Sequence, residues 1–355
     1  MSDKKRTRSV DSALVVILAT TAILLVADPA ASQSASVTGF VQTGYNTTIA
    51  GSPFGSLPIV PPAAGPDATF QVVQARVYVR GQVDDRFGYA VQSNFAGGFT
   101  LLTAYASWQI SNRVSLQAGQ MLKPFGQDRT IPRHQLSSFD RTMTTAQSVN
   151  TLGYGNWDIG AMARIALGRG GDVSIGAFNG RATGTGITRD NDEAKNMVAR
   201  VRLPIGAGGE DNGIALGLSL SSLRLGNAPD GEKDHLAWGL DGRIERGGMA
   251  LTGEAISAED YTGAQTIKTM GYAVTWEQQL AALAGARTTQ FALRLEQYDP
   301  DTDTDDDEML MIVPNLNMAV SDAGRFQVGI VWENPAAGGL DSAMSAVVLM
   351  QVNFF

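Results

Sequence analysis

Four basic side chains lie in the stretch between residues 122 and 155, the longest part of the chain without strand-like alternation. Cationic side chains that line a narrow, low-dielectric passage attract anions, because screening is weak over such short distances. The stretch could therefore guide anionic solutes, provided that it packs inside a larger structure. A connection of this length is usually functional or disordered, and its Pro-Phe-Gly start and apolar residues favour packing. The basic residues are Lys123, Arg129, Arg133 and Arg141, against the acidic Asp128 and Asp140.

Hydrolytic chemistry is the alternative use of the same stretch, because His134 stands near Ser137, Ser138 and Asp140. A base that activates a nucleophile needs such neighbours. However, neither serine lies in the pattern of a nucleophile elbow. We therefore predict no catalytic residue, and a hydrogen-bonding role for His134.

A second group of basic residues lies in segments that alternate between apolar and polar side chains. Arg76, Arg80, Arg200 and Arg202 occupy the polar positions of these segments. Acidic residues occupy polar positions mostly later in the chain, which predicts a field across a pore with a mild anion preference. In the alternative interpretation, opposite charges neutralise one another as salt bridges in the wall.

The acidic run from Asp299 to Glu308 is a third candidate for chemistry. A calcium loop of the EF-hand type would need Gly at its sixth position and Glu at its twelfth. Counted from Asp301, this chain has Asp306 and Ile312 there. We therefore predict no metal site, and interpret the run as a solvated loop that could bind divalent cations weakly or bridge to lipopolysaccharide.

Period-2 alternation recurs along the whole chain and predicts about sixteen strands. Long and short connections alternate between them, as they do when short turns lie on the periplasmic side of a membrane barrel and long loops lie outside. The last strand ends on Phe354 and Phe355, and an aromatic C-terminus suits a strand that closes a barrel against the first one. The predicted strands are 36–47, 69–83, 88–95, 99–110, 113–121, 156–167, 172–179, 195–204, 213–224, 235–245, 248–257, 267–280, 288–297, 308–320, 325–334 and 343–355.

All five tryptophans fall on the apolar positions of their strands, near strand ends. Such indoles are typical of the aromatic girdle at the two interfaces of a membrane barrel. The alternative is the core of a soluble sandwich, in which they would cluster in the middle of the strands. The tryptophans are Trp108, Trp157, Trp238, Trp276 and Trp332.

The first 32 residues have the pattern of a signal peptide. Lys4, Lys5, Arg6 and Arg8 precede an apolar run at 13–26, and small residues follow near Ser32. No other stretch reaches the roughly 20 apolar residues of a spanning helix. The chain has no cysteine and a formal net charge of −8, which excludes disulfides and argues against nucleic-acid binding.

Three motifs resemble a known family. They are Gly119-Gln120-Met121-Leu122-Lys123-Pro124-Phe125-Gly126, then Ser137-Ser138-Phe139-Asp140-Arg141, and then Trp157-Asp158-Ile159-Gly160. Together they resemble the phosphate-selective porin O/P family. The resemblance implies a trimeric outer-membrane porin of 16 strands, whose third loop folds inward and whose basic residues line an anion path.

We therefore expect an all-β, transmembrane antiparallel β-barrel of about 16 strands over residues 33–355, with an inward-folded third loop and a signal peptide at 1–32. We expect passive diffusion of small polar solutes with an anion preference, no cofactor, and contacts with outer-membrane lipids and lipopolysaccharide. A non-selective diffusion porin is the first alternative, and an enzyme or adhesin barrel with a blocked lumen the second. The predicted anion path is Lys123, Arg129, Arg133, Arg141, Arg76, Arg80, Arg200 and Arg202.

Overall fold

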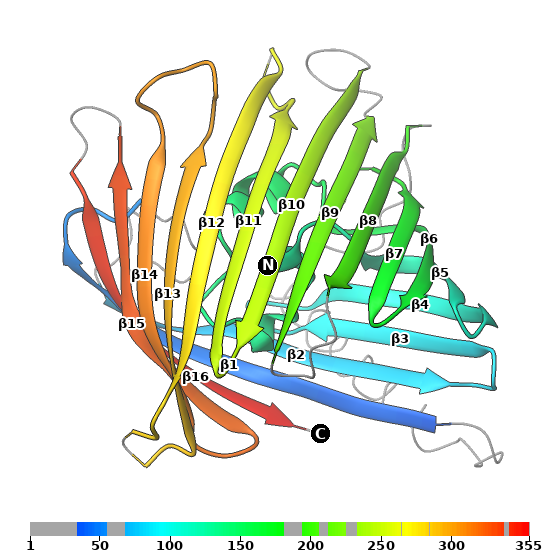
Figure 1. Ribbon diagram of the computed structural model, residues 1–355, viewed down its shortest axis with the longest axis horizontal. Coiled ribbons are helices and arrows are strands. Elements are labelled where there is room, and N and C mark those ends of the chain that lie inside the picture. The colour runs from blue at the N-terminus through cyan, green and yellow to red at the C-terminus, as the bar shows by residue number, and fades with distance from the viewer. Residues whose placement is uncertain are drawn as a thin grey trace, which may run out of the picture.

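Sixteen antiparallel strands close into a single barrel in the computed structural model of the chain (Figure 1). The structure describes residues 34–54, 68–180, 194–205, 212–224, 233–263, 265–283, 285–336 and 341–354. Each strand pairs with its neighbours in the sequence, so the prediction of a 16-stranded all-β barrel is confirmed. The strands are β1 (Ser34–Ala50), β2 (Ala68–Gln82), β3 (Phe87–Asn94), β4 (Thr100–Ser111), β5 (Val114–Leu122), β6 (Trp157–Gly168), β7 (Gly171–Phe178), β8 (Asn196–Ile205), β9 (Asn212–Arg224), β10 (Asp234–Arg246), β11 (Met249–Asp260), β12 (Ile267–Leu280), β13 (Thr288–Asp299), β14 (Met309–Ala319), β15 (Gly324–Pro335) and β16 (Ala343–Phe354).

Closure depends on the pairing of the last strand with the first. Phe40 of β1 lies opposite Asn353 of β16, and the register continues to Ala50 opposite Met344. This pairing removes the two open edges that the sheet would otherwise present to lipid.

The two faces of the wall differ in polarity in the sense expected of a membrane barrel. Leu218 and Leu220 of β9 are exposed at 46% and 53%, whereas Ser219 and Ser221 between and after them are buried. In β10, Leu240 is 54% exposed and Asp241 is buried. Apolar side chains therefore cover the outside and polar ones the inside, the reverse of a soluble protein.

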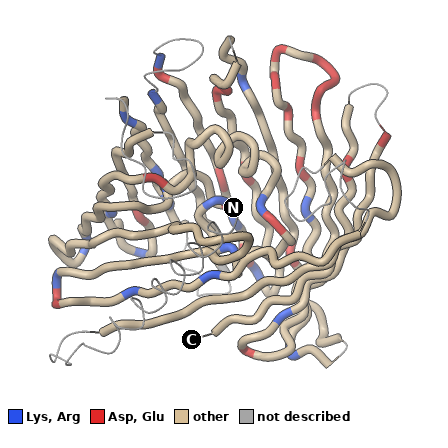
Figure 2. The backbone as a smooth tube through the Cα atoms, turned by 180° about the vertical axis from the view of Figure 1, so that it is seen from behind, with Lys and Arg blue, Asp and Glu red and all other residues tan. Residues whose placement is uncertain are grey.

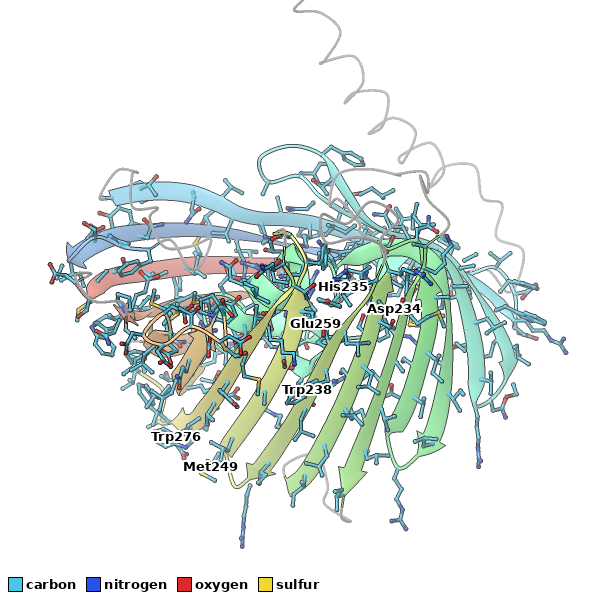
Figure 3. The ribbon with its side chains drawn as sticks, turned by 90° about the horizontal axis from the view of Figure 1, so that it is seen from above. Asp234, His235, Trp238, Met249, Glu259 and Trp276 are labelled. Carbon is cyan, nitrogen blue, oxygen red and sulfur yellow. The ribbon has the colours of Figure 1, made fainter. Side chains whose placement is uncertain are left out.

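Three of the five tryptophans support this orientation, and Trp332 of β15 is half-buried. Trp108, Trp238 and Trp276 are each about 40% exposed on the outer face, and Figure 3 labels the last two. Trp157 instead lies beside the side chains of Arg76 and Arg129. The girdle prediction is wrong for Trp157, because this residue stands at the first position of β6, where its ring packs against the preceding connection.

The connection between β5 and β6 carries three short helical turns. They are α2 (Gln127–Thr130), the 3₁₀ turn η1 (Arg133–Gln135) and the π-helical turn η2 (Thr145–Thr151). None of the helices in the described segments is long and apolar enough to cross a membrane. The predicted signal peptide at 1–32 lies outside the described residues.

Candidate solute pathway

Residues 123–156, the β5–β6 connection, are held by hydrogen bonds to strands far away in the sequence. The backbone N–H of Gly126 donates to Ser219 of β9 (3.0 Å), that of Gln127 to Glu254 of β11 (2.6 Å), and that of Met143 to Glu296 of β13 (2.7 Å). Further amide side chains of the wall donate to the carbonyl oxygens of the connection. These bonds run from Asn315 and Asn317 of β14 to Ser137, from Gln327 of β15 to Leu136, and from Gln351 of β16 to His134.

All these wall residues stand on the polar face of the strands. The connection therefore contacts the inner face of the wall on the side of β9 to β16, and Figure 1 shows its helical turns behind β10 to β12. These contacts agree with a connection that folds into the lumen.

Apolar side chains fix the connection in place. Phe125 and Tyr154 are fully buried in a cluster with inward-facing residues such as Val198, Leu223 and Ile256. A second cluster buries Phe139 against residues of β14 to β16, namely Met311, Val313, Val331, Val347 and Leu349. Burying an aromatic side chain of this size contributes about 1.5–3 kcal/mol, so the connection is a packed part of the structure.

A buried ion pair joins the connection to β13. Arg294 and Glu296 lie 2.9 Å apart with side chains 2% and 1% exposed. Arg294 also donates to the carbonyl oxygen of Asp140 (2.6 Å), while Glu296 accepts the N–H of Met143. The pair therefore holds both sides of the turn that contains Arg141.

A cavity of about 590 Å³, the β2-side cavity, gathers half of the predicted anion path. Arg76 and Arg80 reach it from β2, and Arg133 and Arg141 from the β5–β6 connection. Asp322 is the only acidic residue among its described lining residues. The cavity is therefore rich in positive charge.

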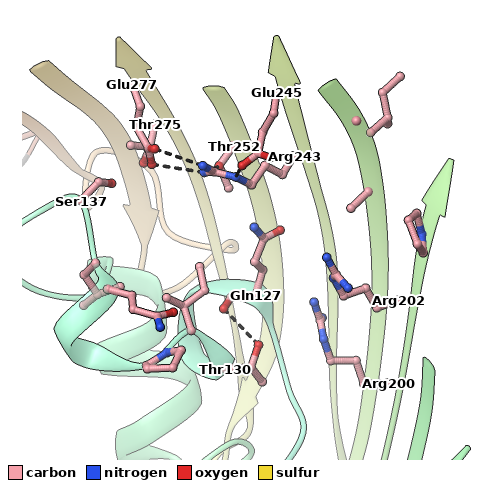
Figure 4. Close-up of a pocket in the computed structure, with 18 residues that line it drawn as sticks. Gln127, Thr130, Ser137, Arg200, Arg202, Arg243, Glu245, Thr252, Thr275 and Glu277 are labelled. Atoms are coloured by element: carbon pink, nitrogen blue, oxygen red, sulfur yellow. Dashed lines mark hydrogen bonds and ion pairs between the residues drawn. The ribbon is translucent and has the colours of Figure 1, made fainter. Parts of the chain in front are cut away.

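A second cavity of about 620 Å³, the β10-side cavity, lies on the other side of the connection (Figure 4). Thr130 to Pro132 and Gln135 line both cavities, so this part of the connection stands between them. Arg200 and Arg202 reach the second cavity. Arg200 forms a bidentate pair with the buried Asp241 (2.6 and 3.0 Å), and Arg202 donates to the carbonyl oxygen of Gly170.

Arg243, which the sequence-based set omits, is the central cation of the β10-side cavity. It pairs with Glu245 (2.6 Å) and Glu277 (3.1 Å), as the dashed lines in Figure 4 show. Arg243 stands two residues after Asp241 and two before Glu245, so it shares their face of β10. The alternation in the sequence was sufficient to predict this position. The charges of this cavity are largely balanced.

Lys123 and Arg129 are not among the described lining residues of either cavity. Lys123 is fully buried, 3.4 Å from Asp158, and donates to the carbonyl oxygen of Gly180 (3.1 Å). Burial lowers the pKa of Lys123 to about 8, against the opposing effect of Asp158. Arg129 lies 4.4 Å from the ring of Trp157 and donates to the carbonyl oxygen of Gly155. Burial lowers the pKa of Arg129 well below its ordinary value.

The two remaining cations of the connection combine internal bonds with a place at the β2-side cavity. Arg133 pairs with Asp140 at 2.7 Å. Arg141 donates to the carbonyl oxygens of Asp128 and Ile131, and burial lowers its pKa. These bonds fix both guanidinium groups in position at the edge of the cavity.

Replacing Lys123 with methionine is expected to destabilise the barrel without changing its ion preference. The substitution leaves Asp158 as a buried, unpaired charge, which costs about 3–5 kcal/mol. A gel run in detergent measures this effect, since the folded barrel migrates differently from the unfolded chain. The temperature at which the folded band disappears should be lower for the variant. The double variant Lys123→Met/Asp158→Leu should recover most of the loss. Reduced anion preference at unchanged thermal stability would instead show that Lys123 faces the solute path.

Figure 2 shows where the acidic residues gather. The connection between β13 and β14 is red, whereas basic residues are spread along the strands. Asp303, Asp305 and Asp306 at the tip of this connection are exposed. In the described residues, no group of three or more His, Asp or Glu side chains is arranged to hold a metal ion.

Comparison with solved structures identifies several outer-membrane proteins with the same architecture. An anion-selective porin from Comamonas acidovorans superposes with a TM-score of 0.66 at 14% identity, over 91% of this chain and all of that one. The outer-membrane channel DcaP of Acinetobacter baumannii gives 0.63 at 14% identity, over 92% and 98% of the two chains. OmpT of Vibrio cholerae in its trimer form gives 0.60 at 13% identity, over 91% and 100%. No curated protein sequence gives a significant match.

The sequence itself matches the model of one protein family. The family is described as phosphate-selective porin O and P, and the match covers residues 55–299, more than half of the chain. The matched region runs from the connection after β1 to the end of β13, and so includes the whole β5–β6 connection. This chain belongs to the phosphate-selective porin O and P family and is an outer-membrane channel for small solutes.

Proposed function

We propose that the protein is a diffusion channel with an anion preference, and that the β5–β6 connection forms its constriction. The observation that carries this proposal is the pairing and position of Arg76 and Arg80. Within the described residues, neither forms an ion pair, and both line the β2-side cavity. Their charge, together with that of Arg141, acts on solutes that pass between β2 and the connection.

The proposed mechanism is passive. A hydrated anion enters the lumen and meets the β5–β6 connection, which divides the available space. It passes through the β2-side cavity because the charge there lowers its energy relative to that of a cation. No step needs a cofactor or a conformational change.

A channel without ion preference is the second candidate, and the β10-side cavity favours it. There, Arg243 is matched by Glu245 and Glu277, and Arg200 by Asp241. A solute that passes on this side meets little net charge. The ion preference of the whole channel is then an average over the two cavities. Its sign is set by the β2-side cavity, where positive charge is in excess.

We further propose that the protein is not an enzyme. The ring of His134 lies 5.2 Å from that of Phe40, and burial lowers the pKa of this histidine. The carbonyl oxygen of Ser137 accepts hydrogen bonds from Asn315 and Asn317. These contacts support a packing role for the group that sequence analysis considered as a possible base and nucleophile.

Export and assembly follow from the same proposal. We propose that residues 1–32 are removed on passage to the periplasm and that the barrel inserts as a homotrimer. One structurally similar outer-membrane protein is described in a trimer form. The apolar outer face would contact outer-membrane lipids, and the acidic β13–β14 connection could contact lipopolysaccharide through divalent cations.

Uptake of three sugars of similar size into proteoliposomes tests the proposal. Gluconate is an anion, glucose is neutral and glucosamine is a cation. The expected order of entry rates is gluconate, then glucose, then glucosamine. Equal rates would support the non-selective channel, and a lack of entry for all three would support a blocked barrel. Phosphate in competition with gluconate would show whether the preference extends to phosphate.

A further inference from the structure

Arg76, Tyr78 and Arg80 form a column along the inner face of β2. They occupy alternate positions of one strand, so neighbouring side chains in the column are about 7 Å apart. All three line the β2-side cavity. Along the passage, a solute therefore meets a cation, an aromatic ring and a second cation in turn.

Aromatic rings surround the two arginines of this column. The guanidinium of Arg76 lies 5.8 Å from the ring of Phe40 on β1 and 5.6 Å from that of Trp157 on β6. The guanidinium of Arg80 lies 4.9 Å from the ring of Tyr78. Phe40 and Trp157 also line the cavity. Rings from β1, β2 and β6 thus border the same positively charged space.

The donors of the column are largely available for a ligand. The Nε of Arg76 donates to Gln74 (2.7 Å), which orients the guanidinium group. Neither Arg76 nor Arg80 is in a salt bridge within the described segments, unlike Arg133, Arg200 and Arg243. A carboxylate can therefore accept two parallel hydrogen bonds from either group.

We propose that the β2-side cavity binds aromatic carboxylates in preference to non-aromatic carboxylates of the same size and charge. The carboxylate pairs with Arg76 or Arg80, and the ring of the ligand packs against Tyr78 or Trp157. A small inorganic anion uses the charge alone, whereas an aromatic acid uses both the charge and the rings. This inference rests on the proposed function, because it assigns a solute class to the same cavity.

Inhibition of the chloride current through the protein in a planar bilayer tests this proposal. Benzoate and cyclohexanecarboxylate serve as probes, since both carry one carboxylate on a six-membered ring and only benzoate is aromatic. Contacts between aromatic rings are worth about 0.5–1.5 kcal/mol beyond the burial of area. The concentration that halves the chloride current should therefore be roughly 2- to 10-fold lower for benzoate.

Substitutions of the two aromatic residues locate the effect. In Tyr78→Leu/Trp157→Leu the two probes should become equivalent, while the chloride preference remains. Tyr78→Phe keeps the ring and should keep the difference, which guards against a loss caused by misfolding. Trp238→Leu, on the outer face, is the matched control and should behave like the unaltered protein.

Two results would overturn the inference. One is equal inhibition by the two probes in the unaltered protein, and the other is a benzoate advantage that survives Tyr78→Leu/Trp157→Leu. Neither result affects the proposed function, which fails only if chloride itself is not preferred over potassium. The two failures are therefore distinguishable in the same bilayer.

Discussion

Replacing Arg76 and Arg80 together with glutamine is expected to lower the chloride-to-potassium permeability ratio roughly fivefold. A unit charge about 7 Å from an ion contributes about 0.6 kcal/mol in bulk water, and screening at physiological ionic strength reduces this to about 0.25 kcal/mol. Each of the two charges stabilises chloride and destabilises potassium by this amount. Together they change the free-energy difference between the two ions by about 1 kcal/mol. Zero-current potentials under a KCl gradient measure the ratio.

The matched control removes the same two charges elsewhere. Arg86 and Arg113 lie in the turns between β2 and β3 and between β4 and β5, and both are exposed. Arg86→Gln/Arg113→Gln changes the net charge by the same amount and should shift the ratio little. An equal shift in both double variants would show that net charge, and not the β2-side cavity, sets the preference.

Removal of the tip of the β5–β6 connection is expected to raise the single-channel conductance severalfold. Replacing residues 127–141 with a short Gly-Ser link removes the part that lines both cavities and separates them. A barrel of sixteen strands encloses an aqueous channel when nothing fills it. The anion preference should fall at the same time, because Arg133 and Arg141 leave with the tip.

A deletion in another connection controls for general damage to the barrel. Residues 300–307 join β13 to β14, where most of the side chains are exposed. Their deletion should leave the conductance unchanged. If deletion of 127–141 left the conductance unchanged in a folded barrel, the connection would not be the constriction.

The strands were predictable because alternation has a direct physical cause. One face of each strand meets lipid and the other meets the lumen, so exposed Leu218 and Leu220 alternate with buried Ser219 and Ser221. The observed bounds lie within about three residues of the predicted ones, as for β8 at Asn196–Ile205 against 195–204. Closure through the C-terminal strand was also predicted, since Phe354 ends β16 beside β1.

The packing of the connection was not predictable from alternation. Val313, Val331 and Val347 face inward and are fully buried, because Phe139 of the connection covers this part of the wall. Alternation assigns a residue to a face of the sheet, but it does not show which other segment covers that face. An apolar residue on the polar face is the signal that such a segment exists.

The charges of the connection show a related limit. Lys123 and Arg129 were grouped with Arg133 and Arg141 by type and proximity in sequence. The structure separates them, because Lys123 is buried beside Asp158 and Arg129 is buried beside Trp157. Irregular backbone carries no period from which the direction of a side chain could be inferred. Arg76 and Arg80 lie on a strand, where alternate residues face the same side. The sequence pattern alone was therefore enough to predict that they lie on the inner face.

The zero-current potential of the unaltered protein in a planar bilayer under a KCl gradient tests the central claim most directly. Arg76 and Arg80 of the β2-side cavity predict a potential of the sign that chloride permeation produces, reduced toward zero in Arg76→Gln/Arg80→Gln. A potential of zero, or one of the sign that potassium permeation produces, would contradict an anion preference set by this cavity.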